Sequence, residues 1–219
     1  MRTTVLAIAT VGLLSFPAAA QNVTESSSGV QFPVTLNQQA LAGTGLRTRT
    51  VLSVKVYAVG LYGEPSAART TLASFAGKDA AALAADNGVY DAMLRMSFPM
   101  TLRLVMTRNV SGDQMKNAFD EVLAERVAAA AQRGMQGGAA ALQTFKGYFS
   151  LDRLTSGTEL VFTCENGNLH STVGGETKAV IASPALCWSL FDVYLGHEPI
   201  QANIRRGLVG RLPEVLAGR

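Results

Sequence analysis

The histidines and glycines of this 219-residue chain give little support to metal or phosphate chemistry. His170 and His197 have no partner at ligand spacing, so we expect surface histidines and no metal site. Gly43-Thr44-Gly45 lacks both the further glycines and the Lys-Ser/Thr pair of phosphate-binding loops. The sequence therefore predicts no metal, nucleotide or other cofactor.

Cys164 and Cys187 are the two cysteines of the chain. In an oxidising compartment they could form a single disulfide. They could also stay free and buried, because Cys187 falls in an apolar stretch with helical character. The sequence leaves both alternatives open.

Arg47, Lys55 and Tyr57 lie on two runs, 41–49 and 51–62, whose Val, Thr and Tyr content predicts β-strands. Alternation with period two predicts that Lys55 and Tyr57 face a cleft or solvent while the even positions pack in the core. Taken alone, Arg47 could form a surface ion pair, Tyr57 could be an ordinary packed tyrosine, and Lys55 is typical of a solvated lysine. The even positions are Leu52, Val54, Val56, Ala58 and Gly60.

The other segments predict helices packed on an antiparallel sheet. Ser111 is placed to cap an amphipathic helix that runs to about Gln132, and Ser183-Pro184 begins another that ends at Gly196. Asn166-Gly167 between two strand-like runs predicts a β-hairpin. Because strands and helices occur in groups, the predicted fold class is α+β and not alternating βαβ.

We also predict a loop over 64–71, a helix over 77–83, a strand over 93–110 broken at Pro99, and helices over 139–148 and 199–208.

The first twenty residues have the layout of a secretory signal peptide. A basic Arg2 precedes an apolar run from Val5 to Phe16 and the small residues Ala18, Ala19 and Ala20. We expect cleavage near residue 21, which leaves residues 21–219 as one periplasmic or secreted domain. No later segment has about 18 uninterrupted apolar residues, so we expect no stable membrane span. An uncleaved anchor is the alternative.

Composition and charge indicate a folded protein without a polyanionic partner. The chain is 48% hydrophobic and 16% charged, which is typical neither of disorder nor of a protein with several membrane spans. It has 19 Lys and Arg against 16 Asp and Glu, and loss of Arg2 leaves a net charge of +2. Because the basic residues are scattered and no basic block alternates with aromatics, we expect no nucleic-acid binding.

Two neighbouring motifs resemble the chalcone isomerase superfamily. The run 41–47, Leu-Ala-Gly-Thr-Gly-Leu-Arg, matches its G-x-G-x-R element, and 54–62, Val-Lys-Val-Tyr-Ala-Val-Gly-Leu-Tyr, matches its K-V-Y-A-x-G-x-Y strand. The resemblance continues through Phe32-Pro33, Ser111-Gly112, Gly157-Thr158 and Leu195-Gly196, and so covers residues 21–219. It implies an antiparallel β-sheet packed against a layer of α-helices, with a ligand cleft between them.

The resemblance also implies which residues line the cleft. The catalytic arginine of plant chalcone isomerases matches Arg47, whose guanidinium could stabilise an oxyanion. The enzymes' other polar positions are replaced here. They fall at Tyr57, Met106, Met115, Val122 and Val193.

The plant fatty-acid-binding branch of the superfamily is a better match than the isomerases. An arginine and the tyrosine of the K-V-Y strand hold a carboxylate there, and they correspond to Arg47 and Tyr57. A guanidinium and a phenolic hydroxyl suit a carboxylate in a dry pocket, because a buried charge must be paired. Met106, Met115, Val122 and Val193 would make the cleft apolar enough for an acyl chain, although each would be an unremarkable core residue elsewhere.

Three hypotheses about function follow. The first is non-catalytic binding of a small apolar ligand, a fatty acid or a flavonoid-like molecule, and an elongated apolar tunnel ending at Arg47 would favour it. The second is an isomerase or lyase acting on a chalcone-like enone with Arg47 and Tyr57, which a polar, water-connected cleft would favour. The third is an accessory protein that acts on an envelope partner, which a collapsed interior and a large exposed apolar patch would favour.

Overall fold

The fold is built on one large antiparallel sheet. The computed structural model describes residues 21–49 and 53–218, so the predicted signal segment 1–20 and Leu52 lie outside the described residues. Strands follow the order β11-β10-β9-β6-β5-β4-β3, and β12 also pairs with β10. The strands of this sheet are β3 (Thr35–Leu36), β4 (Gln39–Arg49), β5 (Val54–Gly63), β6 (Met100–Met106), β9 (Glu159–Glu165), β10 (Asn168–Val173), β11 (Glu176–Thr177) and β12 (Ile181–Ala182).

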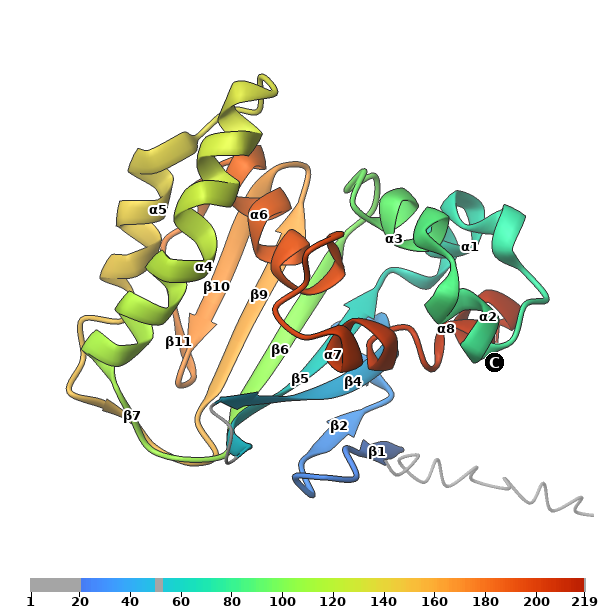
Figure 1. Cartoon of the computed structure of the whole chain (residues 1–219), viewed down its shortest axis with the longest axis horizontal. Helices are drawn as coiled ribbons and strands as arrows, with labels where there is room; N and C mark the ends of the chain where they lie inside the picture. The colour runs from blue at the N-terminus through green and yellow to red at the C-terminus, as the bar shows by residue number, and fades with distance from the viewer. Residues whose placement is uncertain (1–20, 50–52, 219) are drawn as a thin grey trace, which may run out of the picture.

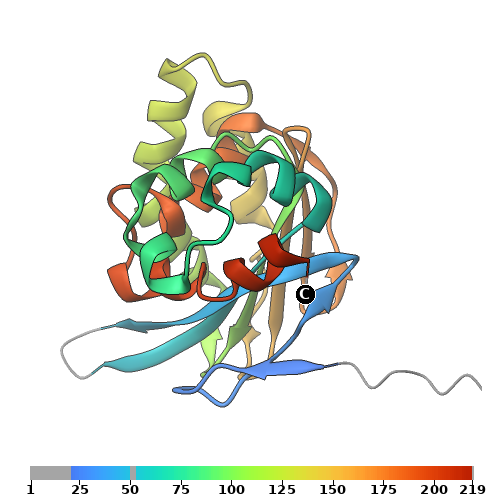
Figure 2. The same cartoon turned by 90° about the vertical axis from the view of Figure 1, so that its right-hand side faces the viewer.

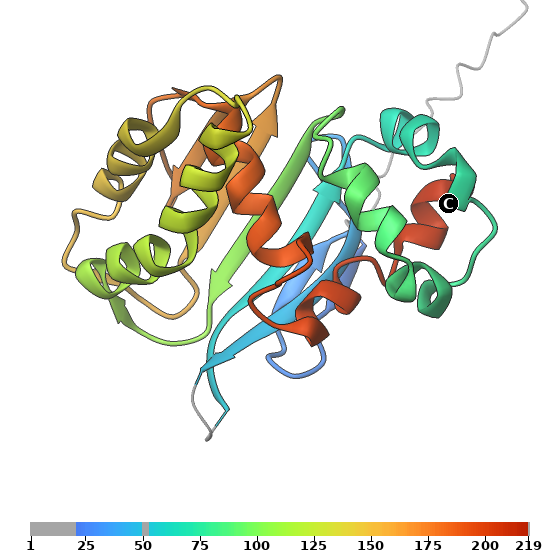
Figure 3. The same ribbon diagram turned by 45° about the horizontal axis from the view of Figure 1, so that its top comes forward.

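Helices cover one face of this sheet and gather at one end of it. In Figures 1 and 3, α4, α5 and α6 lie across β6, β9 and β10, α7 lies on β4, and α8 joins α1, α2 and α3 at the far end. This arrangement confirms the α+β prediction. The helices are α1 (Pro65–Thr71), α2 (Ala80–Ala85), α3 (Asn87–Met93), α4 (Gly112–Gln132), α5 (Gly138–Gly147), α6 (Pro184–Leu195), α7 (Ala202–Gly207) and α8 (Leu212–Ala217), with a 3-10 turn over Ala73–Phe75.

A second, smaller core lies on the opposite face of the sheet. Two short strands, β1 (Asn22–Thr24) and β2 (Gln31–Pro33), cross beneath β4 and β5 there, as Figure 2 shows from the side. Phe32 of β2 is fully buried against Leu46 and Tyr62. Both faces of β5 are therefore buried over its second half, although the alternation of residues predicted one face open to a cleft or to solvent. A further short pair, β7 (Val110–Ser111) with β8 (Arg153–Leu154), lies before α4.

A β-bulge in β5 changes which of its side chains share a face of the sheet, so the predicted alternation was wrong there. Arg47 pairs with Tyr57 and Thr48 pairs with Lys55, so Val56 is an extra residue without a partner. The bulge shifts the alternation by one residue. Tyr57 and Val56 consequently face the helices together, whereas Lys55 points the other way and donates to the Ser27 carbonyl.

The predicted helix caps and the hairpin are confirmed. The Ser111 hydroxyl accepts from the Gln114 amide while the Gln114 side chain accepts from the Ser111 amide, which forms a capping box at the start of α4. Ser183 caps α6, with Pro184 in its first turn. Asn166 and Gly167 take positive φ values of 49° and 75° in the turn between β9 and β10, as the Asn-Gly pair requires.

Three predicted boundaries were wrong for local reasons. The segment 64–71 is not a loop but contains α1, because the Glu64 carboxylate caps it and Pro65 suits its first turn. The strand expected over 93–110 is confined to Met100–Met106. The predicted first residue of that strand, Met93, belongs to α3 instead, a helix whose N-terminus is capped by the Asp86 side chain. The last helix is shorter than expected, and α8 after it was not predicted.

The structure joins Cys164 and Cys187 in a disulfide. The bond connects β9 to α6, the Cα atoms of the two cysteines are 5.7 Å apart, and the cysteines are separated by 23 positions in the sequence. Of the two alternatives left open by the sequence, the structure shows the disulfide. The bond holds the first turns of α6 against the sheet, and α6 carries part of the candidate site at its other end.

The G-x-G motif lets α7 lie directly on β4. A side chain on Gly43 would collide with the Gly207 carbonyl oxygen, and one on Gly207 would collide with the Thr44 carbonyl oxygen. A Cβ on Gly45 would lie 3.1 Å from the Ile204 Cα. Glycine is required here because two backbones approach each other closely. The contact places the chain between α6 and α7 beside Arg47.

We predict that Gly43→Ala lowers the free energy of unfolding by about 1–3 kcal/mol, because the new methyl group must displace α7 from β4. Gly147→Ala is the matched control, since no atom lies within 4 Å of the position that its new methyl group would take. Alanine in a helix should leave stability unchanged or raise it slightly. Urea unfolding of the three proteins measures the difference, and equal stabilities would contradict this account of the motif.

Candidate functional site

Arg47 is held at the end of β4 by the segment that connects α6 to α7. Its Nη1 donates to the Ile200 carbonyl oxygen at 3.4 Å. The neighbouring Thr48 is tied to Gln201 twice: the Thr48 amide donates to Oε1 and the Gln201 Nε2 donates to Oγ1, both at 3.0 Å. The half-buried guanidinium is thus fixed at the edge of an internal chamber with most of its N–H donors unused by these contacts.

Tyr57 forms a buried pair with Tyr194 beside Arg47. The two hydroxyl oxygens are 2.9 Å apart, and the residues are 8% and 3% exposed. One hydroxyl must donate to the other, so the pair retains one O–H for a further acceptor. Among the described residues neither hydroxyl makes another hydrogen bond. The free donor and the Arg47 guanidinium border the same chamber.

The inner chamber is a small space of about 80 Å³ between the sheet, α4 and α6. Five of the six predicted cleft residues line it. Met106 does not: it pairs with Tyr57 across β5 and β6 and is packed in the core at 1% exposure, so that prediction needs correction. The chamber is lined by Arg47, Arg49, Val56, Tyr57, Met115, Ala118, Phe119, Glu121, Val122, Leu123, Leu190, Val193, Tyr194 and Ile200.

An outer chamber of about 390 Å³ adjoins the inner one. The two share six wall residues: Arg49, Val56, Tyr57, Met115, Ala118 and Glu121. Apolar residues of β5, β7 and α4 form much of its wall, and polar residues lie around them. The residues that line the outer chamber alone are Val54, Arg108, Asn109, Val110, Gln114 and Asn117.

Burial keeps both chamber tyrosines protonated. Desolvation raises the pKa of Tyr57, against the opposing effects of its hydrogen bond to Tyr194 and the Arg47 charge. Desolvation also raises the pKa of Tyr194 well above the usual value, and the proximity of Tyr57 adds to this. Both hydroxyls are therefore neutral donors at ordinary pH and cannot act as a base. Of the described residues that line the inner chamber, Glu121 is the one carboxylate, and it is paired with Arg49 at 3.1 Å.

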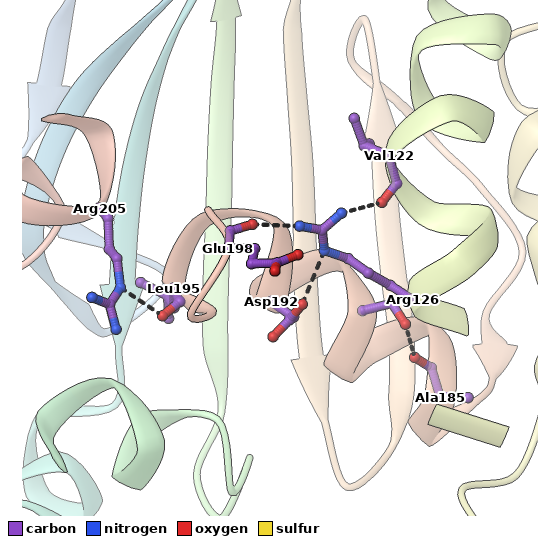
Figure 4. Close-up of polar contacts among 8 residues, drawn as sticks. Val122, Arg126, Ala185, Asp192, Leu195, Glu198 and Arg205 are labelled. Atoms are coloured by element: carbon purple, nitrogen blue, oxygen red, sulfur yellow. Dashed lines mark hydrogen bonds and ion pairs between the residues drawn. The ribbon is translucent and has the colours of Figure 1, made fainter. Parts of the chain in front are cut away.

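Two arginines hold the α6 end of the chamber in place (Figure 4). Arg126 of α4 donates to the Asp192 carboxylate at 2.9 Å, to the Val122 carbonyl at 2.8 Å and to the Glu198 carbonyl at 2.6 Å. Arg205 of α7 donates to the Leu195 carbonyl at 2.9 Å. These contacts fix the last turn of α6, which carries Val193 and Tyr194, against α4 and α7.

Sequence reasoning missed the role of Tyr194 and the two-chamber shape. Tyr194 falls in the helix predicted to begin at Ser183-Pro184, and its only signal is that a buried tyrosine hydroxyl needs a partner. It lies 137 residues from Tyr57, so the pair cannot be recognised from spacing. Arg49 and Glu121 were equally unmarked by any motif. His170 and His197, in contrast, are exposed as expected.

A family model described as chalcone isomerase-like matches residues 20–210. The chain belongs to the chalcone isomerase-like family. This confirms the resemblance drawn from the Gly43–Arg47 and Val54–Tyr62 motifs. Among the described residues, none of the helices has the length and apolar character to span a bilayer.

Relatives of the chain include both binding proteins and enzymes. Fatty-acid-binding protein 2 of Arabidopsis thaliana is 29% identical over 85% of this chain, and the chain spans only half the length of that protein. Fatty-acid-binding protein 1 of the same plant is 26% identical over 87% of this chain and 70% of its own length. A chalcone–flavanone isomerase of Hordeum vulgare is 26% identical over 85% of this chain and 84% of its own.

A solved structure of an Arabidopsis thaliana fatty-acid binding protein has the same fold. It superposes with a TM-score of 0.74 at 24% identity and covers 90% of this chain and 100% of the solved one. The antiparallel sheet with its helical layer is thus the chalcone isomerase-like fold. At this level of identity the likeness concerns the fold alone.

We predict that alkaline pH destabilises the protein through its buried tyrosines. A raised pKa means that above about pH 10 the unfolded chain loses protons that the folded chain keeps, so the free energy of unfolding falls as pH rises. The fall should approach about 1.4 kcal/mol per pH unit for each tyrosine that stays protonated. Urea unfolding between pH 9 and 11 measures it.

The double variant Tyr57→Phe/Tyr194→Phe should show a shallower decline with pH than the wild type. Tyr148→Phe is the comparison. Burial raises the pKa of Tyr148 as well, but this half-buried tyrosine of the loop after α5 lines neither chamber, so its loss should flatten the decline less than the double variant does. A decline that stays as steep in the double variant would show that Tyr57 and Tyr194 titrate normally in the folded protein.

Proposed function

We propose that this protein binds a fatty acid without transforming it, with the carboxylate held in the inner chamber by Arg47 and the Tyr57–Tyr194 pair. The observation that carries the proposal is the set of polar donors at the buried tyrosine pair and Arg47. Arg47 supplies charged donors beyond the one bound to Ile200, and the tyrosine pair supplies one free O–H. A carboxylate provides acceptors for these donors together with the opposite charge.

The rest of the chamber supports an apolar ligand body. Met115, Val122, Val193 and Leu190 surround the polar groups with hydrocarbon. A carboxylate in such surroundings is stabilised by its guanidinium partner, because an ion pair is stronger in apolar surroundings than in water. The named function of two relatives, both fatty-acid-binding proteins, agrees with this proposal.

The isomerase alternative requires a different shape. A chalcone-like enone carries two rings, and drug-sized ligands occupy pockets of roughly 300–1000 Å³. The part of the site beside Arg47 is the inner chamber of about 80 Å³, which suits a small head group better than a ring, and the larger space of about 390 Å³ lies beyond it. Most of the wall residues of the inner chamber are apolar, whereas the isomerase hypothesis calls for a polar, water-connected cleft.

The accessory-protein alternative requires a large exposed apolar patch. Val180 is the one large hydrophobic side chain counted as exposed among the described residues, at 54%. A single valine does not form such a patch.

We also propose that the protein acts in an oxidising compartment outside the cytosol, which the Cys164–Cys187 disulfide and the signal-like first twenty residues support.

Titration with dodecanoate tests the proposed function. Arg47→Ala should weaken binding by about 1.5–3 kcal/mol, the usual value of a hydrogen bond to a charged group. Methyl dodecanoate, which has the same chain but no charge, should bind the wild type weakly and should not distinguish it from the variant. Isothermal calorimetry or fluorescence displacement gives the dissociation constants.

Arg206→Ala is the matched control variant, because Arg206 is an exposed arginine of α7 that lines neither chamber. It should bind dodecanoate as the wild type does. Equal binding of acid and ester by the wild type, with no effect of Arg47→Ala, would contradict the proposal.

A further inference from the structure

The inner chamber cannot hold a whole fatty acid. Its volume is about 80 Å³, and its deep wall is closed by Phe119, Leu123 and Leu190, which are 7%, 0% and 2% exposed. Packed interiors leave no space for further methylene groups without displacement of these side chains. If the carboxylate lies at Arg47, the tail has to leave the inner chamber in another direction.

The outer chamber lies in the direction that remains open. It adjoins the inner one along Val56, Met115 and Ala118, which belong to the walls of both. Its volume of about 390 Å³ is within the usual range of ligand pockets. Val54 and Val110 extend its apolar wall away from Arg47, so a hydrocarbon chain could pass from one chamber to the other in continuous apolar contact.

An ion pair spans the junction of the two chambers. Arg49 ends β4 and Glu121 belongs to α4, so the pair links the sheet to the helix layer at 3.1 Å. Both residues line both chambers. Their side chains are 58% and 66% exposed, and exposed ion pairs contribute little to stability. Such a link can break and re-form readily as a ligand enters or leaves.

We infer that the outer chamber is the binding site for the hydrocarbon tail and that the Arg49–Glu121 ion pair closes over the tail where the chambers meet. The inference rests on the proposed function. It assigns the ligand class more narrowly: a straight-chain carboxylate whose first few carbons occupy the inner chamber and whose remaining carbons lie between β5 and α4. Affinity should therefore rise as the hydrocarbon chain becomes long enough to extend from the inner chamber into the outer one.

Obstruction of the junction tests the path of the tail. Ala118 lies at the junction on α4, and Ala118→Phe should weaken dodecanoate binding by about tenfold or more, as expected when two or more methylenes lose their buried surface. Hexanoate, whose short chain extends less far, should lose much less. Ala124→Phe is the control, because Ala124 is an exposed alanine of the same helix that lines neither chamber.

The comparison between the affinity lost for hexanoate and that lost for dodecanoate decides the outcome. An equal loss for hexanoate and dodecanoate, or no loss for dodecanoate, would overturn the inference. If the Phe variant does not fold, Ala118→Leu is the milder obstruction and should give the same order of losses. Failure of the wild type to bind any acid would instead overturn the proposed function, so the two failures are distinguishable.

Dissociation rates test the ion pair. Glu121→Gln should speed dodecanoate release by several-fold, because the charged link over the tail is lost, and should leave hexanoate release nearly unchanged. Asp113→Asn is the matched control, since it removes the exposed Asp113–Lys116 ion pair of the same helix. Equal release rates in wild type and Glu121→Gln would show that the pair does not close the site.

Discussion

The close approach of α7 to β4 is the constraint on which the candidate site depends. Because Gly43 and Gly207 have no side chains, the helix lies directly on the strand, and the segment that precedes it reaches Arg47 and Thr48. Arg205 then ties α7 back to the end of α6, which carries Tyr194. The position of the arginine and that of the tyrosine pair are thus set by one backbone contact.

The chemistry of the site follows from the burial of the tyrosine pair beside Arg47. Tyr57 and Tyr194 are buried and remain neutral, so they can only donate or share a proton, and they stand beside a permanent positive charge on Arg47. A guanidinium in apolar surroundings binds an anion far more strongly than it would in water. This environment favours the carboxylate that we propose as the ligand group over an alcohol or an amine.

Much of the fold and part of the site could be predicted from the sequence. The motifs around Arg47 and Tyr57 indicated the family, Ser111 and Ser183 marked two helix starts, and Asn166-Gly167 marked the hairpin. Local signals of this kind depend on a few neighbouring residues and can therefore be recognised in the sequence. The helix α1 had such a signal in Glu64-Pro65, and it was overlooked in favour of a loop.

The remaining features depend on contacts between distant parts of the chain. The partner of Tyr57 lies on α6, and the bulge at Val56 becomes visible only when β4 is paired with β5. Met106 was placed in the cleft by its match to an enzyme position, but pairing with Tyr57 leaves it in the packed core. Chamber volumes and the Arg49–Glu121 pair likewise arise from packing, which a single sequence does not display.

The ionisation of a bound ligand tests the central claim most directly. Carbon-13 NMR of dodecanoate labelled at its carboxyl carbon, bound to the protein and followed through the acid range, reports the pKa of that carboxyl group. If Arg47 and the tyrosine pair hold the carboxylate, its pKa should fall below the usual range of a carboxylic acid, and Arg47→Ala should raise it. A bound carboxyl group that titrates as it does in water, or that is protonated at neutral pH, would contradict the account.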